Sequence, residues 1–157
     1  MSDLASTHQE FNPDNLNPKK LHALLLGGVA PRPIAFASTI DKEGRVNLAP
    51  FSYFNVFSAN PPILIFSPAR RGKDNTTKHT LDNVLEVPEV VINMVDYDLV
   101  HACSLASTDY PQGVNEFEKA GLTEVPSVTI TPPRVLESPV SMECKGLKVE
   151  SFGPNPG

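Results

Sequence analysis

Proline is the residue that most constrains how this chain can fold. Sixteen of the 157 residues are proline, which is about twice the usual share. Each proline fixes its own φ angle and lacks the backbone N–H that a helix interior or a central strand needs. This composition disfavours a helical bundle and favours many short elements joined by turns.

The remaining composition is that of an ordinary globular domain. A length of 157 residues suggests one domain, large enough to bury a core. Apolar residues make up 40 % of the chain and charged residues 20 %, as is typical of soluble proteins. The net charge of −5 argues against a nucleic-acid partner, because such a partner requires a basic face. A small anionic ligand held by a local basic cluster remains compatible with this charge.

Several classes of site and location are not indicated. The two cysteines, Cys103 and Cys144, show no CxxC pattern and are expected to be reduced. The four histidines lack metal-ligand spacing, so no metal site is expected. The first residues do not resemble a secretory signal peptide, and no apolar run reaches the length of a membrane span. We therefore expect a cytoplasmic protein without a membrane partner.

The patterned segments predict mainly strands. Residues 1–16 are polar and are expected to form a flexible arm, and Asn17-Pro18 is a typical helix start. Strand-like runs follow at Ile34–Ile40, Arg45–Ala49, Ile63–Ser67, Glu89–Val95 and Val140–Phe152. The first two are joined by a hairpin loop in which Gly44 can adopt a positive φ.

Two of these runs carry more specific predictions. Ile63–Ser67 is nearly all apolar and is expected to be a central strand. In Val140–Phe152 the alternation changes phase after Gly146, which predicts a β-bulge in a long, bent strand. Short strands, a few short helices and one curved strand together predict a small antiparallel barrel with helical insertions.

Val46–Phe57 combines flat apolar rings with short polar groups. Four of the eleven Phe and Tyr residues of the chain occur in these twelve residues, and Asn47, Ser52 and Asn55 lie among them. Because proline lacks an N–H, Pro50 is expected to end the regular strand and to leave nearby backbone groups for another partner. The stretch fits a planar heterocyclic ligand, and it also fits a core strand that leaves the sheet.

Ser67–Lys78 carries a basic cluster directly before a predicted helix. Its twelve positions hold four basic residues, Arg70, Arg71, Lys73 and Lys78. We expect Thr76 or Thr77 to cap the helix. A helix N-terminus with basic and hydroxyl side chains beside it suits a phosphate group, whereas the alternative is a solvated surface loop. The same two interpretations apply to Arg32: it is either a solvated surface charge or a contact to an anionic ligand.

The order of these motifs resembles that of the flavin reductase-like family, which are FMN-binding split β-barrels. The resemblance spans roughly residues 29–150, and the series of motifs is more specific than any one of them. The matching stretches are Pro31–Ala35, Ser38-Thr39, Gly44–Asn55, Pro61-Pro62, Lys73–Lys78 with Asn83, Val91–Asn93, Tyr110–Phe117, Ala120–Leu122, Glu137–Val140 and Glu143-Cys144.

The resemblance implies non-covalently bound FMN in a homodimer whose site lies near the subunit interface. It places the flavin ring along Asn47–Asn55 and the phosphate in the Ser67–Lys78 loop. The residues expected to bind the cofactor are Ser38, Thr39, Asn47, Ala49, Pro50, Phe51, Ser52, Asn55, Ser67, Arg70, Lys73, Asp74, Thr76, Thr77 and Lys78. No residue of the chain is expected to be catalytic, because the flavin carries the redox chemistry.

Two departures from the family pattern accompany the resemblance. Many members have a shorter loop in which Lys-Asp-Thr leads directly into the helix, so either Thr76 or Thr77 is a candidate for the phosphate contact here. The family also continues past residue 157 with another apolar strand. We therefore expect residues 17–157 to form an FMN-binding split-barrel domain that lacks its closing strand.

The expected function is that of an FMN-dependent oxidoreductase, either a flavin reductase or a flavoredoxin-like electron carrier. Reducing equivalents would pass from NADPH, NADH or a redox partner protein through FMN. One alternative is a non-enzymatic module that binds or stores FMN. Another is a split barrel that has lost flavin and serves only for dimerisation.

Overall fold

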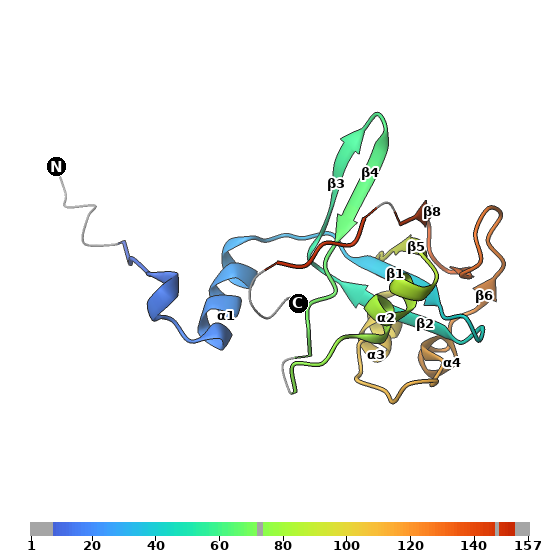
Figure 1. Ribbon diagram of the computed structural model, residues 1–157, viewed down its shortest axis with the longest axis horizontal. Coiled ribbons are helices and arrows are strands. Elements are labelled where there is room, and N and C mark those ends of the chain that lie inside the picture. The colour runs from blue at the N-terminus through green and yellow to red at the C-terminus, as the bar shows by residue number, and fades with distance from the viewer. Residues whose placement is uncertain (1–7, 72–73, 147, 153–157) are drawn as a thin grey trace. The chain divides into compact units, whose positions relative to one another are not determined.

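A computed structural model describes residues 8–71, 74–146 and 148–152, and the chain divides into two compact units, residues 1–32 and 33–157. The first unit contains a 3-10 helix, η2 (Pro13–Asn15), and the helix α1 (Pro18–Gly28) (Figure 1). As predicted, Asn17 caps α1 by accepting a hydrogen bond from Lys20 N at 3.0 Å. Arg32 donates to the carbonyls of Leu26 and Val29, so this cation satisfies the end of its own helix.

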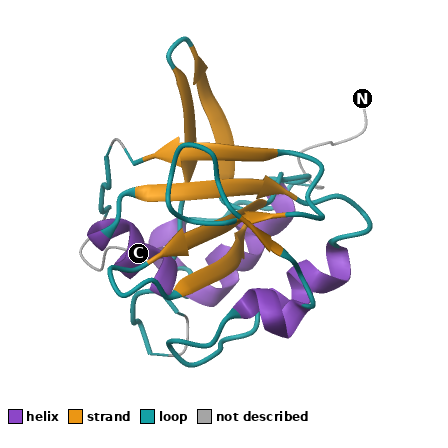
Figure 2. Cartoon of the chain, turned by 90° about the vertical axis from the view of Figure 1, so that its right-hand side faces the viewer, coloured by secondary structure: helices purple, strands orange, loops and turns teal. Residues whose placement is uncertain are grey.

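The second unit is built on a four-stranded antiparallel sheet. The strands are β1 (Ala35–Ile40), β2 (Val46–Phe51), β5 (Glu89–Met94) and β8 (Ser141–Lys145), in the order β2-β1-β5-β8 (Figure 2). The hairpin between β1 and β2 forms as predicted, with Gly44 at φ +83°. This mostly-β architecture with short helices agrees with the predicted fold class.

The sheet is buried on both faces. One face carries Ala35, Ala37, Phe51 and Ile92 in a core cluster, and α2 (His79–Glu86) packs beside it on β1 and β2. The other face carries a second cluster that includes Phe36 and Leu48. This second cluster is covered by the helices α3 (Val100–Ala106) and α4 (Glu116–Ala120) and by β7 (Arg134–Val135), which pairs with β6 (Glu124–Val125).

A second hairpin, β3 (Phe54–Ala59) and β4 (Pro62–Phe66), projects away from the sheet (Figures 1 and 2). The prediction that Ile63–Ser67 is a central strand is wrong. The chain turns at Asn60-Pro61, so this apolar run pairs with β3, and no third strand joins the pair in the described part of the chain. Phe57 is 73 % exposed and Ile65 is 47 % exposed.

Pro50 does not end the strand, because β2 lies at the edge of the sheet and continues to Phe51. The N–H of Leu48 points away from β1 and donates to the Glu116 carboxylate at 3.0 Å. Backbone groups alternate sides along an antiparallel strand, so the N–H that Pro50 lacks would also point outward. Proline is tolerated at such an edge position, and the prediction that it interrupts the ladder was wrong for this reason.

Gly146 marks the end of β8 and not a bulge. β8 stops at Lys145, and residues 148–152 are not in a strand, so the predicted strand to Phe152 is wrong. Gly146 N donates to Pro88 O at 2.7 Å, and a Cβ at this position would lie 3.2 Å from that oxygen. The glycine therefore allows a close approach of two backbones at the end of β8.

Asn93 joins three parts of the second unit through one buried side chain. Its Nδ2 donates to Phe36 O at 3.0 Å, and its Oδ1 accepts from Val135 N at 3.1 Å and from Ser141 Oγ at 2.8 Å. Asn93 is fully buried. Water cannot replace these bonds without opening the core, so the amide fixes β1, β7 and β8 around β5.

We predict that Asn93→Ala lowers the free energy of unfolding by about 3 kcal/mol, because it leaves buried backbone groups of Phe36 and Val135 without partners. Urea denaturation followed by circular dichroism measures this change. Gln112→Ala is the control, since Gln112 is exposed in the segment between α3 and α4, and its effect should stay within about 0.5 kcal/mol. Equal losses in the two variants would contradict the role of Asn93.

Glu143 on β8 holds the loop between β6 and β7. Its carboxylate accepts from Val128 N at 2.7 Å, from Thr129 N at 2.7 Å and from Thr129 Oγ1 at 2.6 Å. These bonds, first the one from the Thr129 hydroxyl and then the one from Val128, lower the pKa of the Glu143 carboxyl group. A lowered pKa in the folded state means that protonation weakens the folded state.

The expected result is a pH-dependent stability that Glu143→Gln reduces. The stabilisation is complete above the ordinary carboxyl pKa of about 4.3 and disappears as the pH falls through the lowered folded-state pKa. Thermal unfolding between pH 7 and pH 3 should therefore decline less steeply in Glu143→Gln than in the wild type. Glu118→Gln, at an exposed position on α4, is the control. Identical pH profiles for wild type and Glu143→Gln would contradict this prediction.

Candidate functional site

The two stretches predicted to form a ligand site are adjacent in the structure. Lys78 Nζ lies 5.0 Å from the centroid of the Phe51 ring, within the range of a cation–π contact. At the other end of the loop, Ser67 N donates to Tyr53 O at 2.9 Å. The loop that carries the basic cluster therefore begins and ends against the outgoing end of β2.

Arg71 organises the basic loop. Its Nε donates to Asp109 Oδ1 at 2.9 Å, and its Nη1 donates to Thr76 Oγ1 at 3.3 Å and to Thr77 O. The Arg71 backbone also donates to Thr76 O and accepts from Asn75 N, both at 2.9 Å. The sequence prediction did not include Arg71 among the cofactor-binding residues. Nothing in the sequence indicates which of the two adjacent arginines turns into the loop.

Arg70, which was predicted to bind the cofactor, contacts the same loop at another point. Its Nη1 donates to Asn75 O at 2.6 Å, so it closes the same turn from the outside. Asn75 has a φ of +59°, a left-handed conformation that asparagine tolerates better than most residues. Lys73 was also predicted to bind the cofactor, and it lies outside the described residues.

The hydroxyl groups of the loop are engaged with nearby carboxylates. Asp74 Oδ1 accepts from Thr76 N at 3.0 Å and from Thr76 Oγ1 at 2.7 Å. Thr77 Oγ1 donates to Asp82 Oδ1 at 2.8 Å. The prediction that Thr76 or Thr77 caps α2 is wrong, because Lys78 occupies the N-cap position. The Thr77 hydroxyl reaches an acid in the first turn instead of a backbone N–H.

The start of α2 is electropositive. Burial, and then the charge of Arg71, lower the pKa of the Lys78 ammonium group. The same two causes lower the pKa of His79. Asp109 opposes both effects. An anion bound here would offset the repulsion between these cations, so the arrangement is suited to a phosphate or another small anion.

Buried polar pairs fasten α2 to the sheet. Asn47 Nδ2 donates to Thr80 Oγ1 at 2.9 Å, and Asn83 Nδ2 donates to Thr39 Oγ1 at 3.2 Å. All four residues are buried. Asn47 and Thr39 were predicted to bind a cofactor, and the structure places both at the junction between β1, β2 and α2, where they hold the helix in position.

The other predicted residues differ in accessibility. Ser38 is fully buried, and its hydroxyl has no hydrogen-bond partner among the described residues. Ala49, Pro50 and Ser52 are partly exposed along the edge of β2 and just beyond it. Asn55 lies exposed on β3, where its Oδ1 accepts from Val56 N at 2.8 Å. The accessible part of the predicted ring site is thus the short edge from Ala49 to Ser52.

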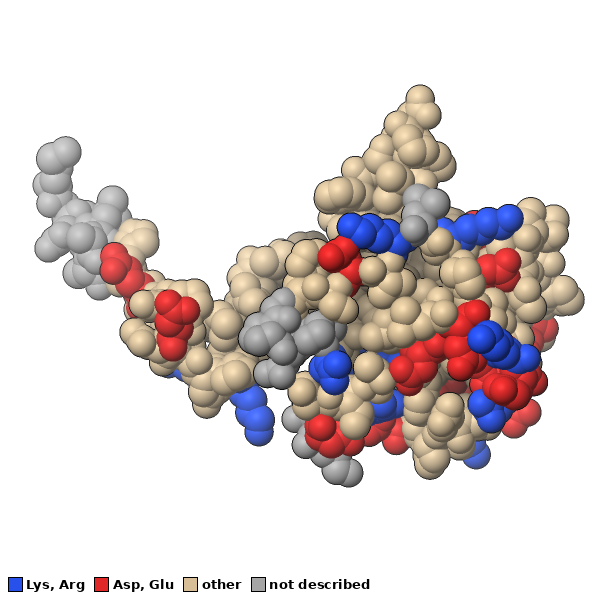
Figure 3. Space-filling view, in the orientation of Figure 1, with Lys and Arg blue, Asp and Glu red and all other residues tan. Residues whose placement is uncertain are grey.

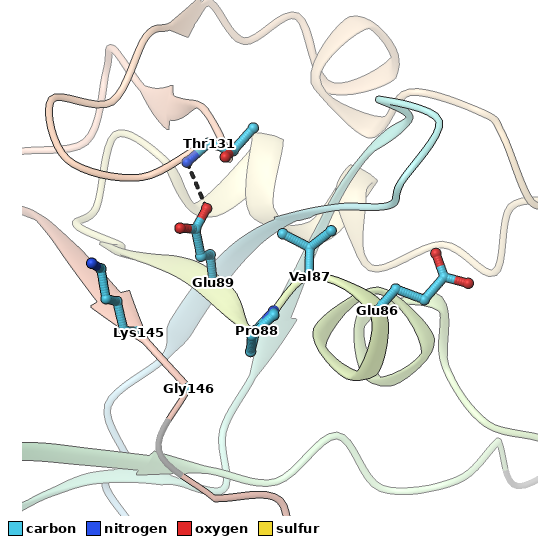
Figure 4. Close-up of a pocket in the computed structure, with 7 residues that line it drawn as sticks. All are labelled: Glu86, Val87, Pro88, Glu89, Thr131, Lys145 and Gly146. Carbon is cyan, nitrogen blue, oxygen red and sulfur yellow. Dashed lines mark hydrogen bonds between the residues drawn. The ribbon is translucent and has the colours of Figure 1, made fainter.

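A separate open depression of about 420 Å³ lies at the other end of α2 (Figure 4). It is lined by Glu86, Val87, Pro88, Glu89, Thr131, Lys145 and Gly146. The Glu89 carboxylate accepts a hydrogen bond from Thr131 N at 2.8 Å. A structural hydrogen bond therefore bounds the depression. None of the residues predicted to bind a cofactor contributes to it.

Neither a metal-binding cluster nor a membrane-spanning helix occurs in the described part of the chain. No group of three or more His, Cys, Asp or Glu side chains could hold a metal ion in that part of the chain. None of the helices found there is long and apolar enough to cross a membrane.

Comparison with known families identifies the fold. Residues 26–153 match the model of the flavin reductase like domain. The chain belongs to this family. A protein of Aquifex aeolicus without an assigned function is 46 % identical over 139 residues, which cover 88 % of this chain and 70 % of that protein. The resemblance drawn from the sequence motifs is therefore confirmed.

Solved structures agree with this assignment. Nitrilotriacetate monooxygenase component B from Bacillus cereus has a TM-score of 0.88 at 35 % identity, covering 93 % of this chain and 71 % of that one. 2-Nitrobenzoate 2-nitroreductase from Pseudomonas fluorescens has a TM-score of 0.80 at 33 % identity, covering 93 % of this chain and 69 % of that one. A Shewanella frigidimarina structure with a split barrel domain has a TM-score of 0.74 at 23 % identity, covering 95 % of this chain and 74 % of that one. It shares the fold.

Membership of this flavin reductase-like family supports a flavin cofactor and an oxidoreductase activity. The residues present also fit such a group. A partly exposed edge, Ala49–Ser52, lies beside a cationic loop, and Lys78 connects the two. A planar ring that carries a phosphorylated side chain needs both surfaces at once.

Proposed function

We propose that this flavin reductase-like chain is an FMN-dependent oxidoreductase. It would accept reducing equivalents from NADH, NADPH or a redox partner protein and pass them on through non-covalently bound FMN, as a flavin reductase or a flavoredoxin-like carrier does. The observation that carries the proposal is the position of Lys78 over Phe51. This contact joins the basic loop to the strand edge along which a flavin ring would lie.

The phosphate of FMN would be held by the loop before α2. Lys78 is half-buried and has no carboxylate partner among the described residues. Arg70 and Arg71 lie in the same loop, together with Lys73 and the hydroxyl groups of Thr76 and Thr77. Cations in a partly buried site bind a phosphate more strongly than the same cations in open water.

The flavin ring would lie along the edge from Ala49 to Ser52. Pro50 presents a carbonyl but no N–H on the outer side of β2, because both backbone groups of a residue point the same way in an antiparallel strand. We infer that this carbonyl accepts a hydrogen bond from the ring. Asn47 and Thr39 then act from beneath the site, by keeping α2 and its basic loop at a fixed distance from this edge.

When bound, FMN supplies the hydride and electron transfer itself. The chain therefore needs no acid or base of its own at this site. Its residues bind the phosphate, orient the ring and exclude water from the inner ring face. The monooxygenase component and the nitroreductase among the similar structures bear names of redox proteins, which supports the same role for this chain.

The first test is a titration of the purified full chain with FMN, followed by assays of NADH and NADPH oxidation. We expect quenching of FMN fluorescence and oxidation of at least one nucleotide that depends on FMN. A chain that leaves FMN fluorescence and absorbance unchanged would contradict flavin binding. Binding without turnover with either nucleotide or a reduced carrier protein would favour the storage module.

The matched variant for this titration is Lys78→Met, which keeps the length of the side chain and removes its charge. We expect FMN affinity to fall about tenfold, which corresponds to about 1.4 kcal/mol, because a half-buried cation beside the phosphate is lost. Lys42→Met, in the exposed loop between β1 and β2, should leave affinity unchanged.

We further infer that two copies of the chain form a homodimer through the β3–β4 hairpin. The 24 residues from Val46 to Ala69 contain no Asp, Glu, Lys or Arg. In the space-filling view, the projecting hairpin accordingly shows no charged side chain (Figure 3). Val56 and Phe57 are 64 % and 73 % exposed. A second copy would bury this apolar surface, and the hairpin begins beside the proposed ring site.

Sedimentation velocity over a range of protein concentrations tests the dimer. We expect the wild type to sediment as a dimer, and Phe57→Glu to shift the equilibrium toward monomer at least tenfold. Tyr97→Glu, at an apolar position that is 90 % exposed but distant in sequence from the hairpin, is the control. A monomeric wild type, or equal effects of the two variants, would contradict a hairpin interface.

A further inference from the structure

The contact between Arg71 and Asp109 connects the proposed phosphate loop to a different part of the chain. Asp109 lies in the segment after α3, 38 residues away in sequence, and accepts from Arg71 Nε at 2.9 Å. The Arg71 side chain is 17 % exposed, whereas that of Asp109 is 64 % exposed. The arginine is thus nearly enclosed, and the acid that neutralises it faces water.

Hydrogen bonds other than the one to Asp109 also hold the guanidinium group of Arg71 in place. Its Nη1 donates to Thr76 Oγ1 and to the carbonyl of Thr77, directly before the start of α2. Asp109 occupies only Nε, and the described residues provide no partner for Nη2. A planar guanidinium with a fixed orientation and a donor that no described residue occupies is suited to bind a phosphate oxygen.

Asp109 is the acid from outside the loop and α2 that acts on this cluster. Its negative charge opposes the effect of Arg71 on both Lys78 and His79. Any phosphate bound at the loop would meet the same charge and would be repelled by it. Asp109 and the phosphate are therefore competitors for one set of cations.

We propose that Arg71 is the residue by which this site distinguishes a phosphorylated flavin from an uncharged one, and that Asp109 is a built-in competing anion that limits this selectivity. The inference rests on the proposed function. It assigns specificity to a residue pair, one member of which lies outside the basic loop. Asp109 partly offsets the positive charge of the cluster when no phosphate is bound, at the expense of affinity when one is.

The experiment compares FMN with riboflavin, which has the same ring and no phosphate. Fluorescence titrations at low ionic strength give the ratio of the two dissociation constants for each variant. In Arg71→Gln we expect the preference for FMN to fall at least tenfold while riboflavin affinity stays the same. In Asp109→Asn we expect the preference to rise about three- to tenfold, because a unit charge near the phosphate is removed.

The double variant Arg71→Gln/Asp109→Asn tests whether the two residues act together. If Asp109 acts as the counter-anion of Arg71, its removal should have a smaller effect on the FMN preference once Arg71 is absent. The matched control is Asp98→Asn, which removes an exposed carboxylate before α3 and should leave the preference unchanged. The gain in Asp109→Asn should also shrink in high salt, because Asp109 is exposed to solvent.

Two results would overturn this inference while leaving the proposed function intact. One is FMN binding by the wild type with a preference that neither variant changes. The other is an equal loss of FMN and riboflavin binding in folded Arg71→Gln, which would make the arginine purely structural. Failure of the wild type to bind either flavin would overturn the inference and the proposed function together. Thermal unfolding of each variant verifies that it is folded.

Discussion

Two buried hydrogen bonds between side chains determine where the site can form. Asn47 to Thr80 and Asn83 to Thr39 attach α2 to β1 and β2. The position of α2 fixes Lys78, which precedes its first residue, and thereby the basic loop that ends there. A helix of eight residues has little stability in isolation. The site therefore depends on these polar contacts with the sheet, as well as on the apolar packing around them.

The outer edge of β2 serves two purposes along its length. At Leu48 the outward N–H is covered by the buried Glu116 carboxylate, whose pKa is raised by burial, with the hydrogen bond from Leu48 acting in the opposite direction. Two residues further on, Pro50 has no N–H that could need covering. One edge is thus protected by an acid at its centre and left accessible at its end, where the candidate ring site lies.

Local sequence signals predicted the elements well where one physical rule decides the outcome. Asn17 before Pro18 marks a helix start because capping and the proline φ angle agree, and Gly44 marks a hairpin because a positive φ is needed there. The family could be recognised from motif order. The apolar run Ile63–Ser67 was misjudged, because its composition is the same whether strands cover it or a partner does.

The details of the site depend on tertiary contacts that a sequence does not display. The choice between Arg70 and Arg71 depends on Asp109, 38 residues beyond Arg71. Thr77 does not cap α2 because Asp82 lies within reach of its hydroxyl. The pattern around Gly146 predicted a bulge, whereas the structure shows its backbone packed against Pro88. In each case the local pattern allows two structures, and a contact with another residue selects one.

The uncharged β3–β4 hairpin also affects how the protein behaves at high concentration. The outer edges of both strands expose backbone donors and acceptors, and natural edge strands usually carry a lysine or another charge that discourages unwanted pairing. No such gatekeeper residue occurs between Val46 and Ala69. In the proposed dimer, a second copy would cover this surface and would thereby also limit unwanted pairing between folded chains.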